Sequence, residues 1–113
     1  MNRRGEPAER LAAAYLERQG LAILERNYRC RFGEIDLVAT HDATLVFIEV
    51  RARESEAFGG AAASITGAKR RRLVAAARHY LAQHRVRGAC RFDVVLVRGR
   101  EPVIEWLTNA FGE

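Results

Sequence analysis

The spacing of hydrophobic residues predicts two amphipathic helices. Between Pro7 and Gln19, apolar residues recur three and four positions apart, the period of one helical face. The opening proline suits a first helical turn, where its missing amide hydrogen is not needed, and Gly20 suits the left-handed position that ends a helix. A second helix is predicted to begin after Ser64 or Thr66 and to run to about His84.

Alternating and continuous apolar stretches predict strands. Glu34–Thr40 alternates, with Ile35, Leu37 and Ala39 on one face. Leu45–Ala52 is apolar on both faces and rich in β-branched residues, which favours a central strand covered on both sides. The other predicted strands are Leu21–Tyr28, Phe92–Val97 and an edge strand at Pro102–Leu107, and the predicted turns around the alternating strand are Arg29–Gly33 and His41–Thr44.

The order of these elements predicts the fold class. Helix, three strands, helix and two strands indicate a three-layer α/β domain, in which two helices flank a mixed β-sheet. The chain has 113 residues, so we expect one domain over residues 1–113. We place the Gly- and Ala-rich segment Arg53–Ile65 in a flexible loop.

Composition restricts the partners. Apolar residues make up 49% and charged residues 29%, which is typical of a globular protein, and the net charge of +5 favours anionic partners. The longest uncharged run, Ala57–Ala68, is too short and polar to span a bilayer, and the start of the chain leads into an amphipathic segment. We therefore expect a cytoplasmic protein without membrane association, with Cys30 and Cys90 as reduced thiols.

Two acidic residues converge in the hairpin formed by the two best strands. If His41–Thr44 is the turn, the antiparallel register places Asp36 directly opposite Glu49, with Cβ atoms about 4.5–5.5 Å apart. Two carboxylates this close repel each other. A shared proton, a neighbouring arginine such as Arg51 or Arg53, or a divalent cation would each offset the repulsion.

The divalent cation is the alternative with chemical consequences. Mg²⁺ (or Mn²⁺) takes oxygen ligands, which Asp36, Glu49 and the backbone carbonyl of Val50 could supply. Glu9, at the edge of the apolar stripe of the first helix, could add a third carboxylate. Such a cation polarises a phosphoryl oxygen and acidifies a bound water, as phosphodiester hydrolysis requires.

Four segments carry a family resemblance that covers nearly the whole chain. They are Gly33–Val38, Phe47–Arg51, Ile65–Lys69 and Arg91–Val95, and in this order they resemble the YraN family of small bacterial proteins. That family is similar to the restriction-endonuclease-like PD-(D/E)XK superfamily, and especially to Holliday-junction resolvases. The resemblance implies an αβββαβ core and metal-ligand roles for Asp36 and Glu49, with Glu9 as the acidic residue of the first helix.

The sequence departs from the superfamily pattern at one position. The pattern has a lysine two residues after the glutamate, where this chain has Arg51. A guanidinium stays protonated, so we expect Arg51 to hold the scissile phosphate and not to act as a base. Lys69, the only lysine of the chain, begins the second helix and could replace the missing lysine in space.

Basic residues provide candidate contacts to a phosphate backbone. Four cations at the start of the second helix oppose its dipole, which suggests a use in gripping phosphates, although a solvated face is the alternative. The candidate nucleic-acid-binding residues are Arg29, Arg31, Arg53, Lys69, Arg70, Arg71 and Arg72.

The sequence therefore predicts a metal-dependent endonuclease acting on branched or structured DNA, with Asp36, Glu49, Arg51 and Glu9 in the catalytic site. A resolvase cuts two strands, so the resemblance also implies a homodimer by analogy. Two alternatives remain: a non-catalytic DNA- or RNA-binding module with the same fold, and a protein-interaction adaptor whose basic charge is incidental.

Overall fold

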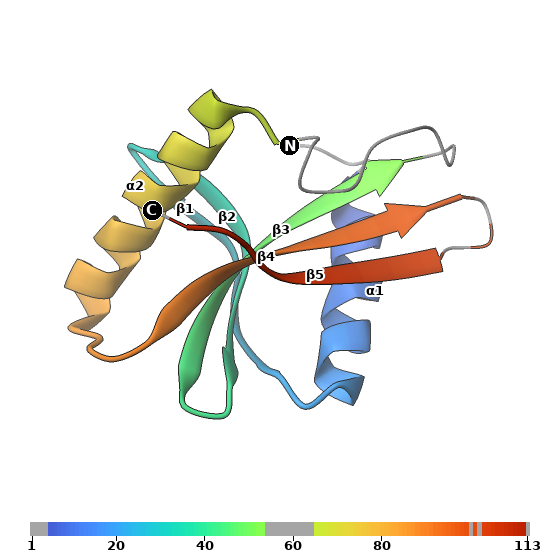
Figure 1. Ribbon diagram of the computed structural model, residues 1–113, viewed down its shortest axis with the longest axis horizontal. Helices are drawn as coiled ribbons and strands as arrows, with labels where there is room; N and C mark the ends of the chain where they lie inside the picture. The colour runs from blue at the N-terminus through green and yellow to red at the C-terminus, as the bar shows by residue number, and fades with distance from the viewer. Residues whose placement is uncertain (1–4, 54–64, 100, 102, 113) are drawn as a thin grey trace.

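A computed structural model describes residues 5–53, 65–99, 101 and 103–112 of the chain. The helices and strands follow the predicted order (Figure 1). They are α1 (Gly5–Arg18), β1 (Ala22–Cys30), β2 (Gly33–His41), β3 (Thr44–Arg53), α2 (Gly67–His84), β4 (Cys90–Arg98) and β5 (Val103–Phe111).

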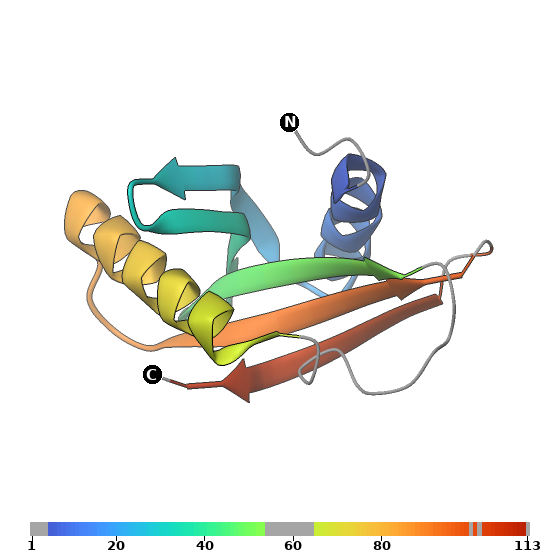
Figure 2. The same ribbon diagram turned by 90° about the horizontal axis from the view of Figure 1, so that it is seen from above.

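The strands form one mixed sheet in the order β1-β2-β3-β4-β5. Neighbouring strands run antiparallel except β3 and β4, which are parallel and joined through α2. Figure 2 shows the β1–β2 hairpin turning away from the three longer strands, so that a gap opens between β2 and β3. β5 lies at the edge of the sheet, as the proline before it predicted.

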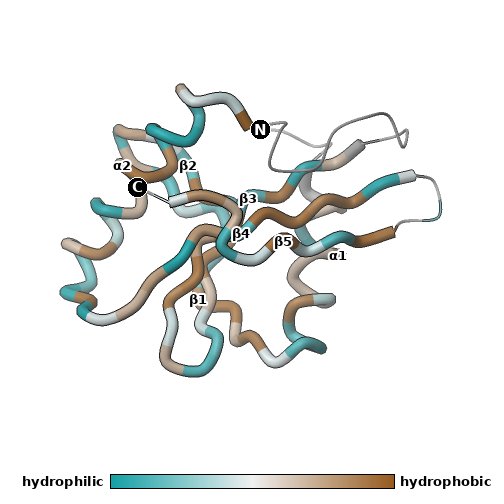
Figure 3. The backbone as a smooth tube through the Cα atoms, in the orientation of Figure 1, coloured by the Kyte–Doolittle hydropathy of each residue, from teal (hydrophilic) through white to brown (hydrophobic). Residues whose placement is uncertain are grey.

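The two faces of the sheet bury separate hydrophobic cores. α1 packs through Ala12 and Leu16 on one face, and α2 packs through Leu73 and Tyr80 on the other. Figure 3 shows hydrophobic positions running along the central strands, and β4 is buried continuously from Phe92 to Val97 because helices cover both of its faces. The predicted three-layer α/β fold with a mixed sheet is therefore confirmed.

The β2–β3 hairpin keeps the predicted register with a shorter turn. Thr40 pairs with Leu45 as expected, but His41 also pairs with Thr44, so the predicted four-residue turn is wrong. Asp42, at a φ of 55°, takes a left-handed conformation that aspartate tolerates, and this lets two residues close the turn.

The predicted alternation of β2 is wrong at its start. Leu37 and Ala39 face the α1 core, but Ile35 packs in the α2 core together with Val38. The irregularity lies beside Asn27 of β1, which has a φ of 54° and interrupts regular pairing between Arg26 and Tyr28. A left-handed residue inside a strand bends it, and here the bend carries the hairpin tip towards α2.

The ends of several elements differ from the predictions. Thr66 caps α2 by accepting a hydrogen bond from the Lys69 amide at 3.1 Å, which decides between the two predicted caps. The predicted basic turn Arg29–Gly33 is only Arg31 and Phe32, and the last strand continues to Phe111. Most of the predicted loop, residues 54–64, lies outside the described residues.

Neither of the two helices combines the length and the apolar character needed to cross a membrane, within the residues that the structure describes. Both cysteines are free.

Candidate functional site

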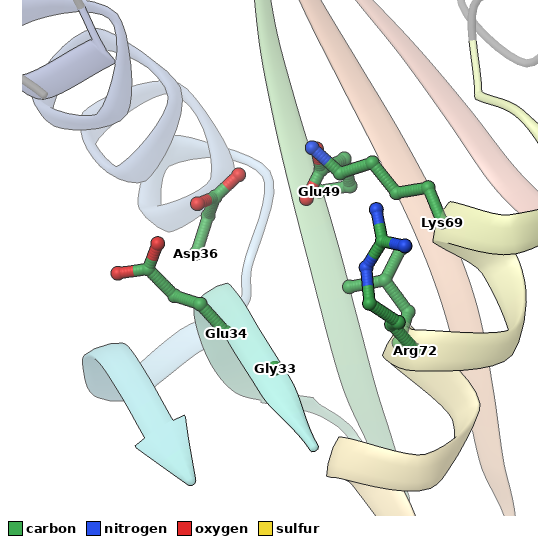
Figure 4. Close-up of a pocket in the computed structure, with 7 residues that line it drawn as sticks. Gly33, Glu34, Asp36, Glu49, Lys69 and Arg72 are labelled. Carbon is green, nitrogen blue, oxygen red and sulfur yellow. The ribbon is translucent and has the colours of Figure 1, made fainter. Parts of the chain in front are cut away.

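A polar pocket of about 200 Å³ opens where β2 separates from β3. Its wall is formed by the beginning of β2, the middle of β3 and the first turns of α2 (Figure 4). The lining residues are Gly33, Glu34, Asp36, Glu49, Lys69, Arg72 and Leu73. The pocket thus brings together the two carboxylates that the register predicted and two cations of the basic α2 segment.

Asp36 and Glu49 meet across the gap between the strands. The regular pairing of β2 with β3 ends at Leu37 and Ile48, one position before the two carboxylates. Beyond that point the Asp36 Oδ2 accepts a hydrogen bond from the Val50 amide at 2.8 Å, and the Asp36 side chain also hydrogen-bonds to Glu49. The side chain of Asp36 therefore takes the place of a strand neighbour and holds the gap open.

The surroundings of Asp36 disfavour its charged form. Partial burial, followed by the charge of Glu49, raises the pKa of Asp36 from 3.8 to about 8, although the Val50 hydrogen bond acts in the opposite direction. At neutral pH the two carboxyl groups therefore share a proton, which is one of the three predicted ways to relieve their repulsion.

Glu49 faces two cations. It is 4% exposed, and its Oε2 lies 2.6 Å from the Lys69 Nζ but 3.6 Å from the Arg51 NH1. The stronger contact therefore comes from α2, and Lys69 occupies the position beside Glu49 that the strand lysine was expected to hold. The only lysine in an arginine-rich chain was the sequence signal for this residue, and the distance across the pocket required the structure.

Glu9 approaches the same carboxylates from α1. Its side chain is half-buried and hydrogen-bonds to Asn27 and Asp36. Burial is the largest cause of the raised pKa of Glu9, which the charges of Glu34 and Glu49 raise further. The inward orientation predicted for Glu9 is thus observed, whereas the sequence gave no reason to single out Asn27.

The other basic candidates are distributed around the pocket. Arg72 lines it, while Arg71 on α2 is exposed. Arg29 bonds the exposed Glu34 through its Nε at 2.8 Å, and the Arg70 guanidinium lies 5.5 Å from the centre of the Phe111 ring. The side chain of Arg53 lies outside the described residues, and Arg31 stacks on Phe32.

The donor set suits a hard divalent cation, because its carboxylate oxygens carry more negative charge than one ammonium balances. The residues that could hold the ion are Asp36, Glu49 and Glu9, and the backbone of Val50 adjoins them through its amide. Among the described residues, no three acidic, thiol or imidazole side chains already form a complete ligand cluster. Metal binding would therefore require Lys69 to move away from Glu49.

A second buried acidic residue has a different role. Asp93 is fully buried and accepts hydrogen bonds from the Arg91 and Trp106 side chains and from the Asn109 amide, at 2.8–3.2 Å. These bonds tie β4 to β5 where the pairing of the two strands shifts. The structural role predicted by its alternation with apolar neighbours fits this geometry.

The fold and site define a small α/β domain with a carboxylate pocket at a split in its sheet. The family model described as "Uncharacterised protein family UPF0102" matches residues 8–97. A UPF0102 protein of Nitrosomonas europaea is 60% identical, covering 97% of this chain and 94% of its own. One of Methylobacillus flagellatus is 53% identical, covering 98% of both chains. The chain therefore belongs to the UPF0102 (YraN) family, which confirms the resemblance drawn from its motifs.

Proposed function

We propose that this protein is a metal-dependent endonuclease that hydrolyses phosphodiester bonds in branched or structured DNA. The observation that carries the proposal is the meeting of Asp36 and Glu49 in one pocket with Lys69 and Arg72. Acidic groups that could hold a cation and basic groups that could hold a phosphate stand on opposite walls (Figure 4). Phosphodiester hydrolysis requires both kinds of group at one place.

Each side chain has a part that follows from its position. Asp36 and Glu49, with Glu9, would hold Mg²⁺ or Mn²⁺, which when bound polarises a phosphoryl oxygen and acidifies a water. Arg72 and Arg51 stay charged and would bind the phosphate oxygens. Of the cations beside Glu49, Lys69 is the one whose side chain can release a proton, so it takes the role that Arg51 cannot.

The DNA backbone would be held by the cations around the pocket. The exposed Arg29, Arg31 and Arg71 lie on the elements that frame it, and the net charge of +5 favours long-range attraction. These contacts read no base, so we expect preference for a DNA shape over a sequence.

A cleavage assay tests this proposal. A four-way junction and a linear duplex are incubated with and without Mn²⁺ and with wild type, Glu49→Gln and Glu34→Gln. Glu34 lines the same pocket but is exposed and paired with Arg29, so its variant is the matched control. We expect metal-dependent cleavage of the junction by wild type and Glu34→Gln, and loss of cleavage in Glu49→Gln. Cleavage that persists in Glu49→Gln or without metal would refute the proposal.

A second candidate is a DNA-binding module that does not cleave. The observation that favours it is the 2.6 Å ion pair between Lys69 and Glu49, which already supplies a cation to the buried carboxylate. Titration calorimetry with Mn²⁺ separates the two candidates. The nuclease binds the metal and loses this binding in Asp36→Asn, whereas the module binds DNA in a salt-dependent manner but binds no metal.

A further inference from the structure

An exposed aromatic ring stands at the turn between β1 and β2. Arg31 and Phe32 form this turn, and the Phe32 side chain remains 39% exposed. Two-residue hairpin turns favour glycine, asparagine and aspartate. The local backbone therefore gives no reason for a large apolar side chain at this position.

The ring is held on a rigid support. Its centre lies 6.0 Å from that of the His79 ring in an edge-to-face arrangement, and His79 is fixed by a 2.5 Å hydrogen bond between its Nδ1 and the Tyr28 hydroxyl. The Arg31 guanidinium lies over Phe32, 4.8 Å from the ring centre. A planar cation and an aromatic ring are thus presented together at the surface.

This pair adjoins the carboxylate pocket. Phe32 directly precedes Gly33, a lining residue whose Cα faces α2 so closely that a methyl group there would lie 3.5 Å from the Cβ of Arg72. The hairpin tip, the cation Arg72 and the carboxylates therefore follow one another along one side of the pocket (Figure 4). A strand with a phosphate in the pocket would pass the hairpin tip with a neighbouring nucleotide.

We propose that Phe32 and Arg31 form a stacking surface for an unpaired base next to the phosphate bound in the pocket. The proposal rests on the proposed function and gives it a substrate preference. Bases stack on aromatic rings and on guanidinium planes regardless of their sequence. A base inside a duplex has both faces covered by its neighbours, so this surface favours DNA with an unpaired base at a flap or branch point.

The alternative role for Phe32 is packing, because its edge against His79 also anchors the hairpin. Phe32→Leu separates the two roles, since leucine keeps an apolar contact with His79 but offers no flat π-face. Phe32→Trp keeps both and adds a fluorescent reporter. Val103→Ala is the matched control, because Val103 is a similarly exposed apolar residue that lies on the edge strand β5 and outside the pocket lining.

The test measures DNA affinity by fluorescence anisotropy in EDTA, with a duplex carrying a single-stranded flap and a fully paired duplex of equal length. We expect Phe32→Leu to bind the flap about 5- to 150-fold more weakly, the range that one stacked base contributes, with unchanged affinity for the paired duplex. Phe32→Trp should retain flap affinity and lose part of its tryptophan fluorescence, measured as the difference from wild type.

Two results would overturn the inference alone while the nuclease proposal stands. In the first, wild type cleaves the junction and Phe32→Leu binds the flap equally well. In the second, Phe32→Leu weakens both substrates equally, which assigns the ring to packing. Failure of wild type to bind either DNA would overturn the inference together with the proposed function.

Discussion

The substitution Asp36→Asn should stabilise the metal-free protein, and increasingly so as the pH rises. The asparagine side-chain oxygen can still accept the Val50 hydrogen bond, but the amide carries no charge against Glu49. In wild type, the pKa of Asp36 is about 8, against an ordinary value of 3.8, chiefly because of burial and then because of Glu49. Folding therefore holds a proton on Asp36 that the unfolded chain releases.

The sign and size of the effect follow from this difference. Between pH 4 and 8 the folded state binds more protons at Asp36 than the unfolded state, so wild-type stability falls as the pH rises through this window and levels off above about pH 8. A pKa difference of about 4 corresponds to at most roughly 5–6 kcal/mol. Asp36 is only half-buried and its neighbours can relax, so we expect about 2–4 kcal/mol between pH 5 and pH 8.5.

Thermal unfolding in EDTA measures this prediction. For a domain of this size, about 2–4 kcal/mol raises the Tm of Asp36→Asn above that of wild type by roughly 8–16 °C at pH 8.5, and by much less at pH 5. Glu34→Gln should show no such growth with pH, because Glu34 is exposed and paired with Arg29. An equal change at both pH values, or a less stable Asp36→Asn at pH 8.5, would refute the opposition of the two carboxylates.

Four further outcomes follow from the contacts around the site and the core. Lys69→Ala should bind Mn²⁺ more tightly in calorimetry, because a cation no longer competes at Glu49, while junction cleavage falls about 10²- to 10⁴-fold; unchanged cleavage would remove Lys69 from the mechanism. Glu9→Gln should weaken Mn²⁺ binding in the same assay without unfolding the protein, because it removes one carboxylate from the set. Asp93→Ala should lower the free energy of unfolding by about 3–5 kcal/mol in urea, since it leaves Arg91 without its buried partner. Thr66→Ala should cost about 1 kcal/mol in the same titration through the lost cap.

The sequence predicted the hairpin register correctly because both strands alternate strongly up to Leu37 and Ile48. It failed at Ile35 because the bend depends on Asn27, whose left-handed conformation arises from contact between β1, β2 and α1. Local patterns encode the period of a strand, whereas the point at which two strands separate depends on what packs between them.

The candidate site was predicted for the same reason that the register was. Asp36 and Glu49 lie on adjacent strands, and counting residues from the turn was sufficient to bring them together. Lys69 belongs to α2, which reaches the pocket only after the chain has crossed from β3, so no spacing along the sequence gives the 2.6 Å contact. Side chains contributed by a crossover helix require the packed structure.

Two aspartates of this chain show why burial alone does not identify a functional residue. Asp93 is the more deeply buried, yet the Arg91 and Trp106 side chains and a backbone amide satisfy its oxygens, as expected of a structural carboxylate. Asp36 is less buried but faces a second carboxylate, which the fold tolerates at a cost in stability. A charge that its surroundings satisfy stabilises the fold, and a charge that they leave opposed is available to a ligand. This contrast places the chemistry at the split between β2 and β3.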